Sequence, residues 1–228
     1  TVNHLLPADC GHQDWIDEIR GLPHSVAHFS LFVGFEGDIE RAGATRSNHW
    51  IYPGGKVDVV WTDVPDSPPP GLFVSFASLK DPGHDPGPSQ KYAGEIIAWA
   101  DWSVVEKWAQ MEPGARGEDY YAFKAGIEDA IFAQFEAYFP ELAKLVVFRS
   151  LSTPLTTRAI TGHHKGAFYG IDTTPERLVS EALQTRTPVP GLFLAGQDVL
   201  SPGIPGALWG GVLAAATVDP RLFRQLPG

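Results

Sequence analysis

The residue types that could support chemistry gather near the C-terminal end of the sequence, between residues 191 and 216. The apolar run at residues 192–195 is typical of a short strand that is buried on both faces. Small and polar residues follow at its carboxyl end, namely Gly196, Gln197 and Asp198. Ligands of open α/β sheets bind beyond the carboxyl ends of strands, and a carboxylate there can accept hydrogen bonds from hydroxyl groups. We therefore expect a ligand site at this turn.

A helix is predicted directly after the turn, ending at about Thr217, because Pro205 suits the first turn of a helix. The free N–H groups at the N-terminus of a helix favour an electron-rich ligand. Gly203 and Gly206 have no side chain and allow a close approach to the backbone. The same residues also fit a simpler alternative, an ordinary buried strand with a Gly/Pro turn and an alanine-rich packing helix.

The elements that must position this segment precede it in the chain. Residues rich in β-formers predict strands at 28–34, 50–53, 57–62, 72–78, 95–100 and 145–151. Apolar residues spaced by three and four predict a long amphipathic helix at 117–138, which Pro140 ends. Shorter helices are expected at 13–20, after a capping box of Ser103 and Glu106, and after Thr174. Strands and helices are segregated, which predicts an α+β fold with a mainly antiparallel mixed sheet and flanking helices.

Composition excludes several classes of function. The 228 residues carry a formal charge of −10, from 17 basic and 27 acidic residues, which argues against nucleic acid and anionic lipid as partners. The single cysteine, Cys10, permits no intrachain disulfide and fits a reducing compartment, so we expect a cytoplasmic protein. His163 and His164 are adjacent and make a poor chelating pair, so no metal is expected. The tryptophans could line an apolar cavity or pack in the core.

The C-terminal segment resembles the last FAD-contacting segment of the phytoene desaturase, carotenoid isomerase and retinol saturase family, within the wider amine-oxidase-like flavoproteins. The resemblance rests on Gly191-Leu-Phe-Leu-Ala-Gly-Gln-Asp198, on Gly203 and on the Pro-Gly-Ala-Leu-Trp-Gly-Gly segment that ends at Gly211. Further segments appear in a similar order in retinol-saturase-like members, so the resemblance covers nearly the whole chain. They are Ser30-Leu-Phe-Val-Gly34, Asn48-His-Trp-Ile-Tyr52, Ser78-Leu-Lys-Asp-Pro82, Thr153-Pro-Leu-Thr156 and Gly166-Ala-Phe-Tyr-Gly170.

The resemblance implies FAD as cofactor and hydride transfer to or from C–C or C=C bonds of an apolar, isoprenoid or carotenoid-like substrate. It implies that Asp198, beside Gly196 and Gln197, holds hydroxyl groups of FAD. The helix start, with Gly203, would face the flavin pyrimidine through Ile204, Pro205, Gly206 and Ala207, while Tyr169 and Gly170 would lie close to the flavin. Lys80 and Asp81 are the nearest candidates for an acid or base, but charged residues in a Pro-rich loop are more often solvated, so the catalytic residues stay unassigned.

The resemblance also implies a division of the chain. Residues 1–186 would form a substrate-binding domain, and residues 187–228 would form a strand and helix that belong to an FAD-binding domain. The sequence departs from the family because it has no Gly-x-Gly-x-x-Gly fingerprint for the dinucleotide. We therefore expect a Rossmann-type FAD domain of roughly 250–300 further residues upstream, as the partner of this C-terminal portion.

The chain by itself is then expected to be inactive and to bind FAD negligibly. Two alternatives stay open: a non-catalytic binding module that shares the fold, and a homodimer formed through an exposed apolar edge of the last strand. Because the expected substrate is apolar, association with a membrane to reach it is also left open. No stretch is long enough for a transmembrane helix, since residues 206–218 fall short of the ~20 apolar residues required.

Overall fold

The computed structural model describes residues 5–7, 10–57 and 59–225. The chain forms two compact units. We call Thr1–Ser25 with Tyr169–Gly228 the terminal unit, and Val26–Phe168 the sheet unit. These limits differ from the predicted boundary after residue 186, because residues 169–186 group with the C-terminal residues. The binding role predicted for each part stays a prediction.

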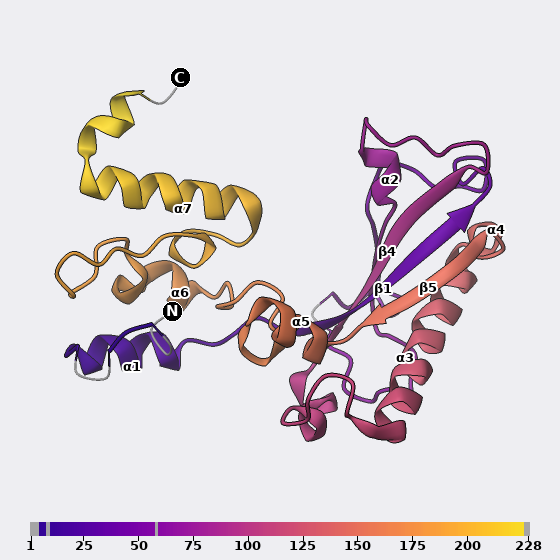
Figure 1. Cartoon of the computed structure of the whole chain (residues 1–228), viewed down its shortest axis with the longest axis horizontal. Helices are drawn as coiled ribbons and strands as arrows, with labels where there is room; N and C mark the ends of the chain where they lie inside the picture. The colour runs from indigo at the N-terminus through magenta and orange to yellow at the C-terminus, as the bar shows by residue number, and fades with distance from the viewer. Residues whose placement is uncertain (1–4, 8–9, 58, 226–228) are drawn as a thin grey trace. The chain divides into compact units, whose positions relative to one another are not determined.

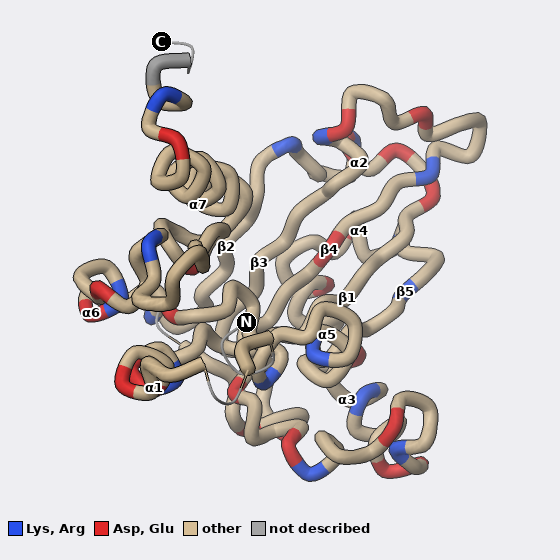
Figure 2. Tube along the Cα trace, turned by 60° about the vertical axis from the view of Figure 1, so that its left-hand side comes forward, with Lys and Arg blue, Asp and Glu red and all other residues tan. Residues whose placement is uncertain are grey.

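A five-stranded antiparallel sheet forms the centre of the sheet unit, with the order β2-β3-β4-β1-β5 that Figure 2 shows. Its strands are β1 (Ala27–Glu36), β2 (His49–Ile51), β3 (Leu72–Ser75), β4 (Lys91–Ala100) and β5 (Val146–Ser152). β1 pairs with β4 along its full length and with β5 on its other side, so it is the strand on which the sheet is organised. The predicted α+β fold with an antiparallel sheet is confirmed.

Helix α3 (Gly117–Tyr138) runs along one face of the sheet (Figure 1) and has the predicted bounds. Alternate residues of β1 point to this face and are buried against it. The helix contributes Ile127, Ile131 and Phe135, each with 0% of its surface exposed. The inward residues of β1, at every second position, and those of α3, at every third or fourth position, therefore pack together in one core.

Shorter helices complete both units. The sheet unit also has α2 (Ala77–Lys80), η1 (Trp102–Val104), η2 (Glu106–Trp108), α4 (Pro140–Ala143), α5 (Pro154–Thr161) and η3 (His164–Gly166). The terminal unit has α1 (Gln13–Gly21), α6 (Pro175–Val179), η4 (Glu181–Leu183), η5 (Gln197–Val199), α7 (Gly203–Val218) and η6 (Pro220–Gln225). The helices predicted at 13–20 and after Thr174 are confirmed, and the Thr174 side chain accepts a hydrogen bond from the Arg177 N–H at 3.3 Å.

The predicted buried strand at residues 192–195 is wrong. Phe193 forms only an isolated bridge with Arg186, and residues 192–194 are only partly buried. A strand buried on both faces needs paired neighbours, and the described part of the terminal unit contains no sheet for it to join. The helix predicted after it is confirmed as α7, which begins at Gly203.

Three other local predictions need correction. The strand expected at 57–62 reduces to a single bridge between Trp61 and Ala100 in the residues that are described. β3 ends at Ser75 because α2 begins at Ala77. The capping box of Ser103 and Glu106 is absent, since Asp101 caps a 3₁₀ turn there and Glu106 instead accepts a hydrogen bond from the Trp102 indole.

Candidate functional site

Gln197 joins two separate segments of the terminal unit that were both predicted to lie at the cofactor. Its side-chain NH₂ donates to the Tyr169 carbonyl at 2.6 Å, and its side-chain oxygen accepts from the Gly203 N–H at 3.1 Å. The second bond satisfies one of the free N–H groups at the start of α7, whose N-cap residue, Pro202, offers no side-chain acceptor. The structure therefore brings the segments around Tyr169 and Gly203 together, although they are far apart in sequence.

Asp198 is held by the same pair of segments. Its Oδ1 accepts a hydrogen bond from the Ile171 N–H at 3.2 Å. Gly170 has φ +86°, and a Cβ added there would lie 3.0 Å from the Asp198 carboxylate, so glycine allows this close approach. The Asp198 side chain is 43% exposed. A half-exposed carboxylate with one oxygen fixed by the backbone is suited to accept hydrogen bonds from ligand hydroxyl groups.

Arg177 is the buried centre of this cluster, and the sequence pattern had indicated only that it stands at the start of a helix. Its side chain is 1% exposed. It donates to the carbonyl oxygens of Ile171 and Gln197, the latter at 2.7 Å, and lies 3.9 Å from Asp198. Buried charges are stable only when they are hydrogen-bonded. Arg177 thus fixes the backbone at Gln197, which precedes Asp198, and at Ile171, which binds the Asp198 carboxylate.

Two glycines of α7, Gly206 and Gly210, serve close contacts within the chain itself. A Cβ at Gly206 would lie 1.7 Å from the Ser201 carbonyl oxygen, and a Cβ at Gly210 would lie 2.1 Å from that of Gly196. The close approach predicted at Gly206 is therefore made by the preceding loop. The outward side chains of α7 are apolar and exposed, with Ile204 at 86% and Leu208 at 66%. An apolar helix with so much exposed surface is suited to be covered by a further partner.

The face of the sheet opposite α3 carries a group of aromatic side chains. We call it the outer face and define it by Phe32, Trp50, Phe73, Trp99 and Phe148, which the strand register places on the same side. Trp50 stacks on Trp99 with ring centroids 5.5 Å apart and meets Phe73 edge-on at 5.0 Å. Trp50 is 58% exposed and Phe148 is 59% exposed. Exposed apolar surface of this kind marks a binding surface.

The five tryptophans of the sheet unit therefore separate into two groups. Trp61, Trp102 and Trp108 are buried in the core. Trp50 and Trp99 lie on the outer face, and of these five only they could form an apolar cavity wall. The sequence could not distinguish the groups, because the side of the sheet on which a tryptophan lies follows from the register of the strands.

His28 lies on the outer face, paired across the strands with Trp99. Burial, and then the nearby His163, lower the pKa of His28 from 6.5 to about 4. Its ring meets Phe168 edge-on at 4.6 Å, and its Nδ1 has no hydrogen-bond partner in the parts of the chain that are described. His28 is therefore a neutral imidazole at neutral pH.

The two residues considered as an acid or base occupy different environments. Lys80 donates hydrogen bonds to Asn48 and, at 2.7 Å, to Ser75, which lies on the outer face. The Asp81 carboxylate accepts from the Gly83 N–H at 2.8 Å and so stabilises its own loop. Of the two, only Lys80 is placed beside a surface that can bind a ligand.

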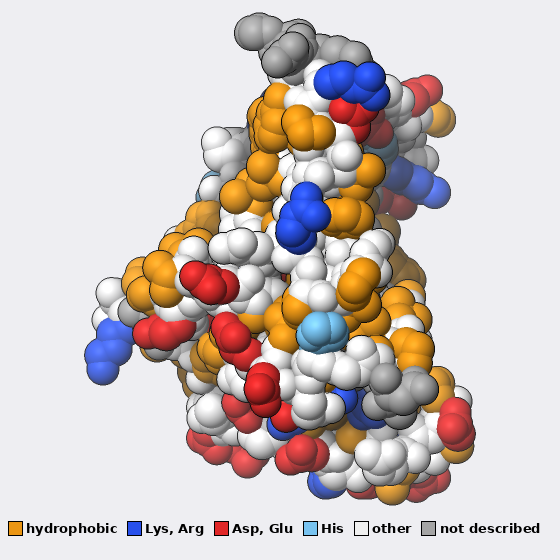
Figure 3. Space-filling view, turned by 90° about the vertical axis from the view of Figure 1, so that its left-hand side faces the viewer, with side chains coloured by type: hydrophobic (Ala, Val, Ile, Leu, Met, Phe, Trp, Pro, Cys, Tyr) orange, Lys and Arg blue, Asp and Glu red, His pale blue; other side chains and the backbone are white. Residues whose placement is uncertain are grey.

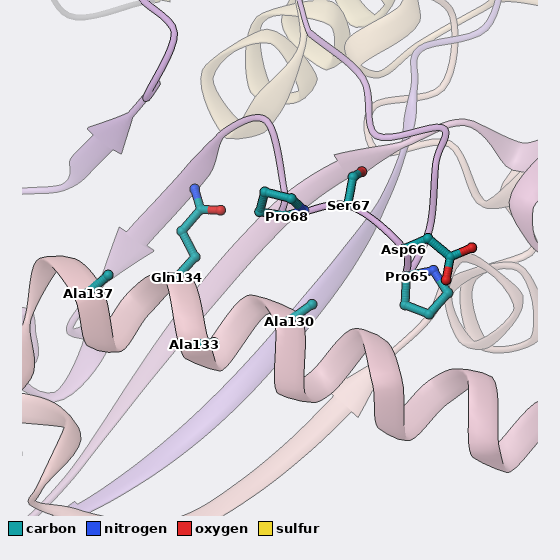
Figure 4. A pocket seen from close by; sticks show the side chains of 8 residues that line it. All are labelled: Pro65, Asp66, Ser67, Pro68, Ala130, Ala133, Gln134 and Ala137. Atoms are coloured by element: carbon teal, nitrogen blue, oxygen red, sulfur yellow. The ribbon is translucent and has the colours of Figure 1, made fainter.

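A pocket of about 460 Å³ lies between α3 and the proline-rich loop (Figure 4). Alanines 130, 133 and 137 of α3 and the prolines at 65 and 68 give it apolar walls. The Gln134 amide points from α3 toward the loop, and its Nε2 is buried without a partner in the described residues. It contains no pair of groups suited to acid–base or metal chemistry, and none of the residues predicted for the site lines it.

On the face shown in Figure 3, the Lys and Arg side chains lie singly and form no basic patch. In the ranges that the structure describes, no group of three or more His, Cys, Asp or Glu is arranged to hold a metal ion. None of the helices in these ranges is long and apolar enough to cross a membrane.

The observed features define an α+β protein with an aromatic outer sheet face and, in its terminal unit, a hydrogen-bonded cluster around Asp198. No protein-family model matches the chain. It is 27% identical, over 99% of its length, to all-trans-retinol 13,14-reductase of Rattus norvegicus, and 29% identical, over 99%, to that of Homo sapiens. It is 30% identical, over 98% of its length, to a Danio rerio protein named inactive all-trans-retinol 13,14-reductase.

These relatives confirm the similarity to the phytoene desaturase and retinol-saturase-like family that the motifs indicated. The chain spans 39% of the length of each of these relatives. The predicted roles of the site residues toward FAD are not decided by this similarity and stay predictions.

Adjacent glycines of α7 offer a matched test of its packing. We expect Gly210→Ala to lower the free energy of unfolding by about 1–3 kcal/mol, because its methyl group meets the Gly196 carbonyl. Gly211→Ala meets nothing within 4 Å and should be neutral or stabilising by ~0.5–1 kcal/mol, as alanine favours the helix. Urea denaturation of both variants measures the difference. Equal stability of the two variants would contradict the close contact with residue 196.

His28 should make the sheet unit less stable in acid. Its pKa is about 4 when folded and 6.5 when unfolded, so the unfolded chain binds the proton more tightly. The stabilisation is complete above pH 6.5 and is lost as the pH falls toward 4, by about 2–3 kcal/mol.

Urea denaturation between pH 7 and pH 4 should show this loss in the wild type, and a smaller loss in His28→Phe. The exposed histidine variant His12→Gln serves as the control and should keep the wild-type pH dependence. If His28→Phe loses as much stability as the wild type, His28 is not buried in its neutral form.

Proposed function

We propose that this chain supplies the substrate surface and one edge of the flavin site of an FAD-dependent oxidoreductase. The enzyme would transfer a hydride between the flavin and a C–C or C=C bond of an apolar, isoprenoid-like polyene. The observation that carries the proposal is the outer face, where the exposed Trp50 stacks on the partly buried Trp99 and forms a surface suited to a flat conjugated chain. The relatives named as reductases of all-trans-retinol support both the reaction type and the polyene.

The terminal unit fits the proposed FAD edge. Asp198 offers a carboxylate that is partly exposed and fixed by Ile171 and Arg177, as an acceptor for hydroxyl groups needs. The start of α7 offers the backbone at residues 204–207, where the partial positive charge of the helix favours an electron-rich ring edge. FAD, when bound, supplies the hydride chemistry. The residues of this chain would hold the cofactor and orient it.

The sheet unit would position the polyene substrate and exclude water from it; it would not transfer protons. Trp50, Phe73 and Trp99 would pack along the polyene and exclude water from it. His28 at the edge of this surface is uncharged at neutral pH, so it adds no charge that an apolar ligand would have to desolvate. We assign no catalytic acid or base.

A second candidate is a binding module that shares the fold without catalysis. The relative named inactive favours keeping this alternative. Both functions use the outer face, and they differ in whether flavin is bound. A protein that contains this chain together with a Rossmann-type FAD domain is expected to be yellow, with flavin absorbance at near-stoichiometric content. A colourless protein that cannot be reconstituted with FAD would support the binding module, and the chain by itself is expected to bind FAD negligibly.

The outer face predicts polyene binding by the chain itself. All-trans-retinol should bind with enhanced retinol fluorescence, and Trp50→Ala or Trp99→Ala should weaken binding about fivefold to tenfold through loss of aromatic contact. Tyr121→Ala, which removes a 50% exposed aromatic residue of α3, serves as the control and should leave the affinity unchanged. Unchanged affinity in both tryptophan variants would exclude the outer face as the substrate surface.

A further inference from the structure

We propose that Lys80, held by Asn48 and Ser75, binds the terminal oxygen group of the apolar ligand on the outer face. We call these three residues the oxygen anchor. The inference rests on the proposed function, because it assumes that the outer face binds a long apolar molecule. It adds which end of the molecule is recognised, and by which chemistry: a carboxylate should bind more tightly than a hydroxyl, and a hydroxyl more tightly than a plain hydrocarbon end.

The strand register places the oxygen anchor beside the aromatic side chains. Trp50 pairs with Phe73 across β2 and β3, and Phe73 pairs with Ile97 of β4. Ser75 lies two residues beyond Phe73 and points to the same face, about 7 Å further along the strand. Asn48 directly precedes β2 and lies two residues before Trp50 in the sequence. A ligand whose apolar body contacts Trp50 and Phe73 therefore reaches the anchor with its end.

Lys80 carries a positive charge at this position. The acidic Glu95 shares the outer face, opposite Ser75 across β3 and β4, but forms no ion pair with Lys80 in the described residues. Lys80 follows β3 in the short helix α2 and returns its ammonium group to the Asn48 and Ser75 oxygens. Both acceptors are neutral, so they orient the ammonium without cancelling its charge. Throughout the described ranges, no carboxylate lies within ion-pair distance of it, whereas the Lys144 ammonium lies 2.5 Å from the Glu141 carboxylate.

The remaining N–H of Lys80 is the donor that a ligand oxygen would use. A lysine ammonium has one donor more than Asn48 and Ser75 accept. Hydrogen bonds in which both partners are charged are stronger than those with one charged partner, which sets the order of carboxylate before hydroxyl. Because Lys80 is exposed, water weakens this attraction, and the preference should be modest, about threefold to tenfold.

Two of the sequence segments that carry the family resemblance meet at the anchor. Asn48 opens the segment that ends at Tyr52, and Lys80 lies in the segment Ser78–Pro82. Their separation of 32 residues along the chain is closed by the hydrogen bond between the two side chains. The anchor is thus a product of the folded sheet unit.

The test compares three probes that differ only at one end: all-trans-retinoate, all-trans-retinol and the hydrocarbon with the same polyene. Binding to the chain is followed by quenching of its tryptophan fluorescence. We expect the wild type to rank the probes in that order. Lys80→Met should reduce the affinity for retinoate about threefold to tenfold, reduce that for retinol less, and leave that for the hydrocarbon unchanged.

Two further variants separate a ligand contact from a loss of folding. Lys80→Arg keeps the charge and should retain the preference for retinoate, and raising the salt concentration should weaken retinoate alone. Lys144→Met removes an exposed lysine of the same unit and should bind all probes as the wild type does. Equal melting temperatures for these variants and the wild type would confirm intact folding.

The outcomes distinguish the two proposals. If all probes bind but Lys80→Met keeps the wild-type ranking, the oxygen anchor is overturned and the outer face stands. If the hydrocarbon fails to bind the wild type, the outer face itself is wrong and both proposals fall. A selective loss of retinoate binding in Lys80→Met, restored in Lys80→Arg, would establish the anchor.

Discussion

The alternation of side chains along β1 is the constraint on which the sheet unit depends. β1 is paired on both edges, so its backbone cannot rotate and its residues must point in turn to one face and the other. One set, which includes Phe29, Leu31 and Phe35, packs toward α3 and forms the core. The other set shares its face with Trp50 and Trp99. A single pairing register therefore fixes both the stable core and the surface that is open to a ligand.

The terminal unit is stabilised in a different way, through polar contacts to backbone. It has little regular structure between α6 and α7, and its described residues include no sheet. The buried Arg177 and the Gln197 amide bind carbonyl and N–H groups that secondary structure leaves unpaired. The small residues of α7 let the helix lie directly on this loop. Such polar contacts hold Asp198 in place, and the unit adds a small apolar cluster around Trp15, Ile16 and Ala182.

The local sequence pattern predicted those helices and strands in which the periodic spacing of apolar residues continues without interruption. The helix at Gly117–Tyr138 was predicted at both ends, because its apolar spacing extends over about four turns and Pro140 blocks its continuation. The strands that pair in the sheet were also predicted, within a few residues. The run at 192–195 was predicted wrongly, because an apolar tetrapeptide becomes a strand only where neighbours supply hydrogen bonds.

The sequence by itself determined the fold class, the long helix, the family resemblance and the candidate residues around Asp198, since each depends on residues close together in the chain. Only the tertiary structure decided that Arg177 lies at the centre of that cluster, that Trp50 and Trp99 lie on the outer face while Trp61 is buried in the core, and that Lys80 meets Asn48. Those contacts join segments that are distant in the sequence. Which residues meet depends on the strand register and on how the chain returns to the same place, and a local sequence pattern encodes neither.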